Sequence, residues 1–169
     1  MFGLLYGEKL DPDSRKELEL LTQGLKRFLL TDHNEDGSHR LGIWTPYAPV
    51  WRGATTQPAI GNGSILGKYA RSVNTIDFKI DIQFGSTTTY GTGTWLFGLP
   101  VASRIDSAVV GHMLGVDGGT TYYTGVVTFV EGMSFVQLVS DAGPWTVSVP
   151  ITWASGDAIS IQGRYEVLD

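Results

Sequence analysis

Residues 75–84 read TIDFKIDIQF, and their alternation decides the fold class. Apolar side chains occupy every even-numbered position of this stretch, and polar side chains occupy every odd-numbered position. Successive side chains of a β-strand point to opposite faces of the sheet. A period of two therefore predicts a strand with one buried face and one solvated face, which is typical of an antiparallel sheet.

Other segments of the chain repeat this pattern. Trp95, Phe97 and Leu99 alternate within residues 93–100, and we expect further strands elsewhere. These lie at residues 64–71, 109–116, 124–130, 134–139, 145–153 and 158–167. Glycine-containing turns separate the segments, and no helical pattern intervenes, which excludes a parallel α/β fold. About eight short strands predict a mainly β chain, folded as an antiparallel β-sandwich or jelly roll, with a bulge at Gly163 in the last strand.

A helix is expected ahead of the sheet. Asp11 is a favourable N-cap, Pro12 suits the first helical position, and the sequence SRKELELLTQGLKRFLL then continues to about Thr31. Apolar residues recur in it at spacings of three and four, the seam of a coiled coil. The seam consists of Leu18, Leu21, Leu25 and Phe28. It predicts association of identical chains, and the alternative is an amphipathic helix packed on its own domain.

A polar connector follows the helix, so we divide the chain into residues 1–44, for oligomerisation and attachment, and a β domain at residues 45–169. Pro46 and Pro49 exclude a continued helix. Trp44 and Trp51 are expected to clamp the helix to the β domain, or one subunit to another. The predicted connector and attachment residues are Asp32, His33, Asn34, Asp36, Gly37, His39, Trp44 and Trp51.

Residues 32–37 match the first half of an EF-hand calcium loop. The twelfth position of such a loop needs a bidentate Glu, and Ile43 stands there. We therefore expect turns built by Asp and Asn side chains, with Gly37 at positive φ, and we predict no metal.

The chain offers little for catalysis. It has no cysteine and three histidines, and no Ser occurs in a G-x-S-x-G motif. Asp77 and Asp81 share a strand face but lie roughly 13 Å apart, too far to act as a pair. His112 is expected on the surface of the sheet. We predict a protein that is not an enzyme and has no cofactor.

Charge and hydropathy exclude two classes of partner. The net charge is −5 and the 12 basic residues are scattered, which argues against nucleic acid. No stretch approaches the roughly 20 apolar residues of a membrane span. The N-terminus lacks the features of a signal peptide, so we expect synthesis in the cytoplasm.

Three aromatic residues are candidates for ligand contact. Tyr122 and Tyr123 are adjacent, so one of them must point away from the core. Trp145 lies beside Pro144 in an expected turn. Exposed Tyr and Trp side chains stack on sugars or on protein partners, whereas the alternative for all three is packing within the domain.

The residues also resemble a known family. The helix with residues 30–40, residues 50–100 and the closing GDAISIQGRYE at residues 156–166 resemble small bacteriophage tail-fibre and minor tail proteins. The order and spacing of the matching positions carry the resemblance. They are Trp51, Gly61-Asn62-Gly63, Gly67, Tyr69, Arg71, Gly85-Ser86-Thr87-Thr88, Gly93, Trp95, Phe97 and Pro100.

This resemblance implies a homotrimeric virion protein with jelly-roll heads, held in the particle by its N-terminal segment among other tail or capsid proteins. A host-surface glycan is the expected ligand of the heads. The chain departs from the family in lacking a long shaft and in having Ser72-Val73-Asn74 where a hairpin glycine is usual. A capsid decoration or head-fibre protein, a free carbohydrate-binding module and a glycan hydrolase remain alternatives.

Overall fold

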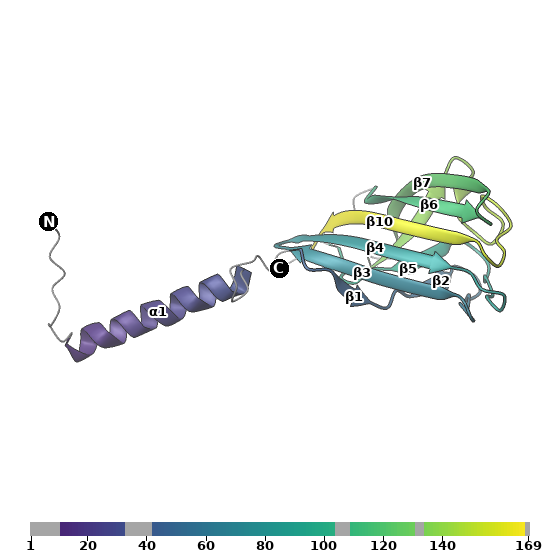
Figure 1. Ribbon diagram of the computed structural model, residues 1–169. Coiled ribbons are helices and arrows are strands. Elements are labelled where there is room, and N and C mark those ends of the chain that lie inside the picture. Colours follow the sequence, from purple (N-terminus) through teal and green to yellow (C-terminus); the bar gives the residue numbers. More distant parts are fainter. Residues whose placement is uncertain (1–10, 33–41, 104–108, 131–133, 168–169) are drawn as a thin grey trace. The chain divides into compact units, whose positions relative to one another are not determined.

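The computed structural model describes residues 11–32, 42–103, 109–130 and 134–167 (Figure 1). The chain divides into two compact units, residues 1–41 and residues 42–169. The described part of the first unit is helical, and that of the second is built of strands. The protein is thus mainly β with one N-terminal helix, as the sequence predicts.

Helix α1 spans Pro12–Asp32. Asp11 caps it: Oδ1 of Asp11 accepts hydrogen bonds from the backbone N–H groups of Asp13 and Ser14, both at 3.0 Å. These bonds satisfy two of the donors that a helix leaves free at its first turn. Hydrogen bonds from Ser14 also lower the pKa of Asp11. The predicted start of the helix is therefore confirmed.

The second unit is one antiparallel sheet that curls around its core (Figure 1). Its described strands pair in the order β1-β3-β4-β10-β6-β7-β8-β5-β2, with β9 against β8. The long central strands are β3 (Ser64–Ser72), β4 (Thr75–Gln83), β6 (Gly111–Asp117), β7 (Thr121–Val130) and β10 (Ala158–Glu166). The shorter strands are β1 (Thr45–Tyr47), β2 (Trp51–Gly53), β5 (Trp95–Gly98), β8 (Phe135–Ser140) and β9 (Gly143–Pro144).

The two edge strands of this sheet are neighbours in the chain. Only residues 48–50 separate β1, which pairs with β3, from β2, which pairs with β5. The N–H of Gly98 donates to the carbonyl of Val50 at 2.8 Å in this interval. Residues 45–53 therefore connect the two edges of the sheet, so the proline-rich stretch is part of the β unit. Proline suits an edge strand, because its missing N–H removes no bond from the sheet interior.

Two local expectations were wrong. Residues 145–153 contain no strand; they form a turn with an isolated bridge between Thr146 and Val149. Gly163 forms no bulge, since β10 pairs with β4 without interruption. A Cβ at Gly163 would lie 2.7 Å from Cε1 of Phe78, so the glycine instead makes room for that ring.

Aromatic side chains fill one end of the core. Trp95 is fully buried, and its ring centroid lies 5.2 Å from that of Trp51 and 5.6 Å from that of Trp153. The Trp153 centroid lies 5.2 Å from Trp145 and 5.6 Å from Phe84. Such edge and tilted contacts add to the stabilisation that burial alone provides.

The turn between β3 and β4 is strained. Val73 has a φ of 54°, the only positive φ of a non-glycine residue among those described. A β-branched side chain is disfavoured in this left-handed region, where L-residues lose about 1–2 kcal/mol.

Replacing Val73 with asparagine is expected to stabilise the β unit by about 1 kcal/mol, because asparagine tolerates the left-handed conformation. Thermal denaturation followed by circular dichroism measures the change. Val73→Ile, which keeps the branched Cβ, is the control and should give no gain. An unchanged or lower midpoint for Val73→Asn would contradict the strain.

Candidate functional site

The polar side of the central strands forms the outer face of the sheet. Asp77, Lys79 and Asp81 alternate with buried residues along β4, as the sequence predicts. Arg164 of β10 lies opposite Asp77, and the two form a bidentate ion pair with Nε–Oδ1 and Nη2–Oδ2 distances of 2.7 and 2.9 Å. Ser160 donates to Asp81 at 2.8 Å in the same way. This face therefore carries polar groups whose geometry is fixed by neighbours across the strands.

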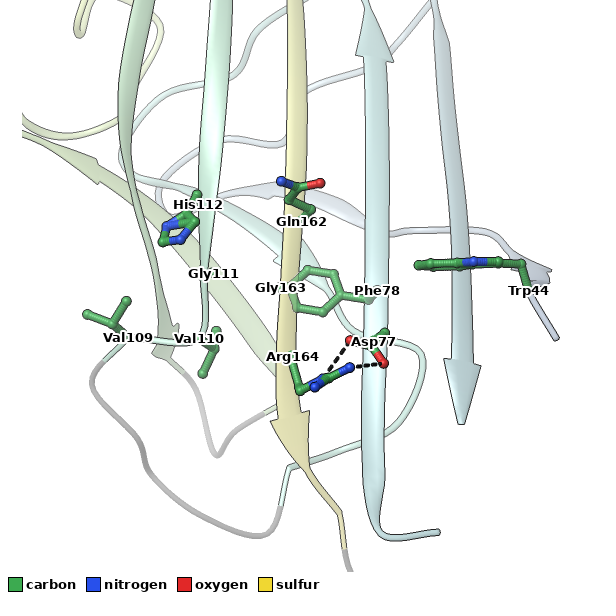
Figure 2. Close-up of a pocket in the computed structure, with 10 residues that line it drawn as sticks. All are labelled: Trp44, Asp77, Phe78, Val109, Val110, Gly111, His112, Gln162, Gly163 and Arg164. Atoms are coloured by element: carbon green, nitrogen blue, oxygen red, sulfur yellow. Dashed lines mark hydrogen bonds and ion pairs between the residues drawn. The ribbon is translucent and has the colours of Figure 1, made fainter. Parts of the chain in front are cut away.

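A shallow cleft of about 610 Å³ lies on this face around the Asp77–Arg164 pair (Figure 2). Gln162 and His112 lie opposite one another on β10 and β6, and both are exposed. Gly111 and Gly163, paired across the same two strands, contribute backbone to the lining. Figure 2 shows these groups on adjacent strands, with Trp44 on the far side of β4.

Trp44 forms one wall of the cleft. Its side chain is 46% exposed, and Nζ of Lys68 lies 5.1 Å from the centroid of its ring. The register of β1 against β3, continued by one residue, places Trp44 beside the small residue Ala70. We call the depression lined by Trp44, Asp77, His112, Gln162 and Arg164 the Trp44 cleft.

A second depression, of about 570 Å³, lies where β7 and β8 meet. Tyr122, Tyr123, Ser140 and Asp141 are among its lining residues. Tyr122 is 65% exposed, whereas Tyr123 is half-buried and packs against the core. The expectation that one of the two tyrosines points away from the core is confirmed. We call this depression the Tyr122 groove.

The two depressions lie at opposite ends of the sheet. Tyr122 lies opposite Val116, which lies opposite Ala158 at the start of β10. Arg164 comes six residues later in β10. At about 3.3 Å per residue the separation along the strand is roughly 20 Å, so one small ligand does not reach both sites.

Of two predicted site tryptophans, Trp145 lies in the core and Trp51 packs against it. Trp145 is 0% exposed, and its indole N–H donates to Oγ of Ser140 at 3.1 Å. This placement corrects the candidacy of Trp145 for ligand contact and agrees with the alternative, packing within the domain. Trp51 is half-buried, and its ring lies parallel to that of Phe97, at an interplanar angle of 2°. It therefore packs within the β unit, whether or not it also serves attachment.

The other predicted attachment residues fall mostly outside the described part of the chain. Asp32 is the last residue of α1. His33, Asn34, Asp36, Gly37 and His39 lie outside the described residues. In the part that is described, no group of three or more His, Asp or Glu side chains could hold a metal ion.

The predicted seam lies on α1. Leu18, Leu21 and Leu25 are 54%, 68% and 60% exposed within the single chain. Leu20 is 61% exposed, and with Leu21, Gly24 and Leu25 it lines a mainly apolar groove on the helix. The side chain of Phe28 lies outside the described residues. No described helix is long and apolar enough to cross a membrane.

Tyr165 forms hydrogen bonds with the segment that follows β5. Its hydroxyl donates to the carbonyl of Val101 at 2.6 Å and accepts from the N–H of Val101 at 3.4 Å. Burial raises the pKa of Tyr165 above its ordinary value of 10.0. Because the pKa of Tyr165 is higher in the folded protein than in the unfolded chain, the contribution of Tyr165 to stability is complete below pH 10. This contribution is lost as the pH rises above 10.

Tyr165→Phe should lower the free energy of unfolding at neutral pH by about 1–2 kcal/mol, because it removes both bonds to Val101. Above pH 10 the variant should lose stability less steeply than the wild type, by up to about 1.4 kcal/mol per pH unit. Urea denaturation between pH 7 and pH 11 measures both quantities. Equal slopes of unfolding free energy against pH in the two proteins would contradict the titration of Tyr165. The variant should keep some slope, because burial also raises the pKa of Tyr47.

Sequence reasoning missed the grouping around the Trp44 cleft. It assigned Trp44 to the connector and His112 to a plain sheet surface, and it did not single out Gln162 or Arg164. Gln162 and Arg164 lie in β10, and Asp77 lies in β4, more than 80 residues away in sequence. The polar positions in both strands were visible, but only the strand register brings them together.

The comparisons relate the chain to one curated protein. It is 31% identical over 111 residues to the Mu-like prophage FluMu defective tail fiber protein of Haemophilus influenzae. The match covers 64% of this chain and 18% of the relative, so the chain spans less than a fifth of that protein's length. No protein-family model and no solved structure matches the chain. The chain is therefore related in sequence to a phage tail-fibre protein.

Proposed function

We propose that the chain is a non-enzymatic structural component of a phage tail, located in the virion, whose β unit contacts the host surface. The observation that carries this proposal is the 31% identity to the prophage tail fiber protein over 111 residues. The match of 111 residues is far longer than a short motif and is comparable in length with the β unit, which has 128 residues.

The proposed oligomer is a homotrimer formed through α1. The exposed Leu18, Leu21 and Leu25 are its proposed contacts, together with Phe28 of the predicted seam. Burying a leucine side chain contributes roughly 1.5–3 kcal/mol, so identical helices gain stability by covering these side chains with one another. A trimer also presents three β units at once, which strengthens weak contacts with a surface by avidity. The jelly-roll form of the head belongs to the same proposal.

Light scattering of the full-length protein tests the oligomer. A mass of three 18.4 kDa chains is expected. A mass of one chain at micromolar concentration would overturn the trimer.

The Tyr122 groove is the proposed contact with a host-surface glycan. An exposed tyrosine beside the hydroxyl of Ser140 and the carboxylate of Asp141 offers stacking and hydrogen bonding together. Fluorescently labelled full-length protein should bind host cells, and Tyr122→Ala should weaken this binding several-fold. Leu66→Ala, at a side chain that is 67% exposed on β3, is the matched control. Equal binding by Tyr122→Ala and the wild type would remove the groove from the proposal.

A capsid decoration protein is the second candidate within the same class. Trimeric chains that bind no host cells would favour it over a tail component with an adhesive head.

A further inference from the structure

We propose that the Trp44 cleft is a second ligand site and that it binds a pyranose saccharide. The proposal rests on the proposed function, since it assigns to the β unit a further contact with surface polysaccharide. Nothing in the similarity to the tail fiber protein identifies this cleft. The proposal is carried by the side chains of three neighbouring strands and by Trp44.

The size and composition of the cleft suit a sugar. Its volume of about 610 Å³ falls in the range of roughly 300–1,000 Å³ that small-molecule sites occupy. The lining combines an exposed indole with a guanidinium, a carboxylate, an amide and an imidazole. A pyranose ring presents a C–H face that stacks on an aromatic ring and hydroxyl groups that both donate and accept hydrogen bonds.

Arg164 and Asp77 are fixed in place before any ligand arrives. Asp77 receives N–H groups from Nε and Nη2 of Arg164, which leaves three of the five guanidinium N–H donors for other partners. The Arg164 side chain is 70% exposed despite this pairing, and that of Asp77 is 31% exposed. Planar donors held in one orientation bind neighbouring hydroxyl groups at a low entropic cost, because little side-chain freedom is left to lose.

Gln162 and His112 extend the polar surface on the side away from Trp44. The Gln162 amide provides both a donor and an acceptor, and the His112 imidazole provides one of each when neutral. Both side chains are exposed, and the two residues are paired across β10 and β6. The indole of Trp44 lies on the other side of β4 and offers the stacking surface (Figure 2). A ring seated over Asp77 would therefore meet hydrogen-bonding groups on one flank and the indole on the other.

The charges nearby favour a neutral or weakly acidic sugar over a strongly charged ligand. Asp77 neutralises Arg164, and Asp81 lies 3.2 Å from Nζ of Lys79. Lys68 contacts the indole ring and adds one positive charge at the edge of the cleft. A polyanion such as nucleic acid needs several phosphate-binding cations together, and the described lining of this cleft supplies one, already paired.

Two probes test the site on the full-length protein. One is an array of bacterial surface polysaccharides; the other is nuclear magnetic resonance of the indole N–H signals during titration with methyl α-D-glucopyranoside, methyl α-D-galactopyranoside and N-acetyl-D-glucosamine. We expect array binding, and a shift of the Trp44 indole signal with at least one of the three sugars. Trp44→Ala and Gln162→Ala should each weaken array binding about tenfold. Trp44→Phe, which keeps an aromatic face, should restore most of it.

Leu66→Ala is the matched control, because it removes an exposed apolar side chain of β3 that lines neither the cleft nor the Tyr122 groove. Binding that survives Leu66→Ala and is weakened in Trp44→Ala supports the cleft. Loss only in Tyr122→Ala overturns it and leaves the host-binding groove intact, and the absence of any bound saccharide also overturns it. Light scattering on the same samples reports the trimer separately, so failure of the cleft is distinct from failure of the proposed tail role.

Discussion

Trp153→Ala is expected to lower the free energy of unfolding of the β unit by about 3–5 kcal/mol, the usual cost of emptying a large aromatic site. The Trp153 side chain is 3% exposed and contacts the rings of Phe84, Trp95 and Trp145. Its indole N–H also donates to the carbonyl of Val149 at 3.3 Å. Both the turn at residues 145–153 and the aromatic end of the core depend on it.

Urea denaturation followed by tryptophan fluorescence and by circular dichroism measures this loss. A domain typically has only about 5–15 kcal/mol of stability, so the variant should unfold at a much lower urea concentration. Tyr122→Ala, at an exposed aromatic side chain, is the control and should change stability by no more than about 0.5 kcal/mol. A loss below about 1 kcal/mol for Trp153→Ala would contradict the packing described here.

The double substitution Leu21→Asp and Leu25→Asp is expected to dissociate the proposed trimer. It removes two apolar side chains from each helix and places carboxylates where helices would meet. With about 1.5–3 kcal/mol for each buried leucine, the association constant should fall by several powers of ten.

Sedimentation equilibrium of the full-length variant at micromolar concentration measures that fall. Gln23→Asp adds one carboxylate to α1 away from the predicted seam, where the double substitution adds two, and is the control. The double variant should sediment as one chain, whereas the control should retain the mass of the wild type. Equal masses for the wild type and the double variant would place the association elsewhere in the chain.

Much of the fold follows from local pattern. The alternation in residues 75–84 corresponds closely to β4, and the pattern at residues 158–167 corresponds to β10. The helix begins at Pro12 because Asp11 caps it, which the residue types alone predict. In each case a short stretch contains the whole signal, because the period of the side chains or the chemistry of the cap is local.

Other features depend on distant partners and could not be predicted. Pro46 and Pro49 excluded a continued helix but did not identify strands, yet β1 and β2 form there because β3 and β5 supply free edges. Trp145 has the sequence surroundings of an exposed turn residue, but Ser140 satisfies its indole and Trp153 covers it. The pattern at residues 145–153 looked like a strand because both of its terminal tryptophans are core residues.

The candidate sites also differ in whether local sequence pattern or distant partners determine them. The exposure of Tyr122 beside a half-buried Tyr123 follows from adjacency in a strand. The Asp77–Arg164 pair depends on the register of β4 against β10, which neither segment specifies alone. The Trp44 cleft therefore emerges only from the structure.

The central claim, that the chain is a tail component of a virus particle, is tested most directly by labelling particles. Gold-conjugated antibody raised against the full-length protein is applied to particles purified from a lysate of cells that express the gene, and electron microscopy locates the label. The account predicts gold on the tail, absent from particles of a strain in which the gene is deleted. Label on the capsid, or on no part of the particle, would contradict it.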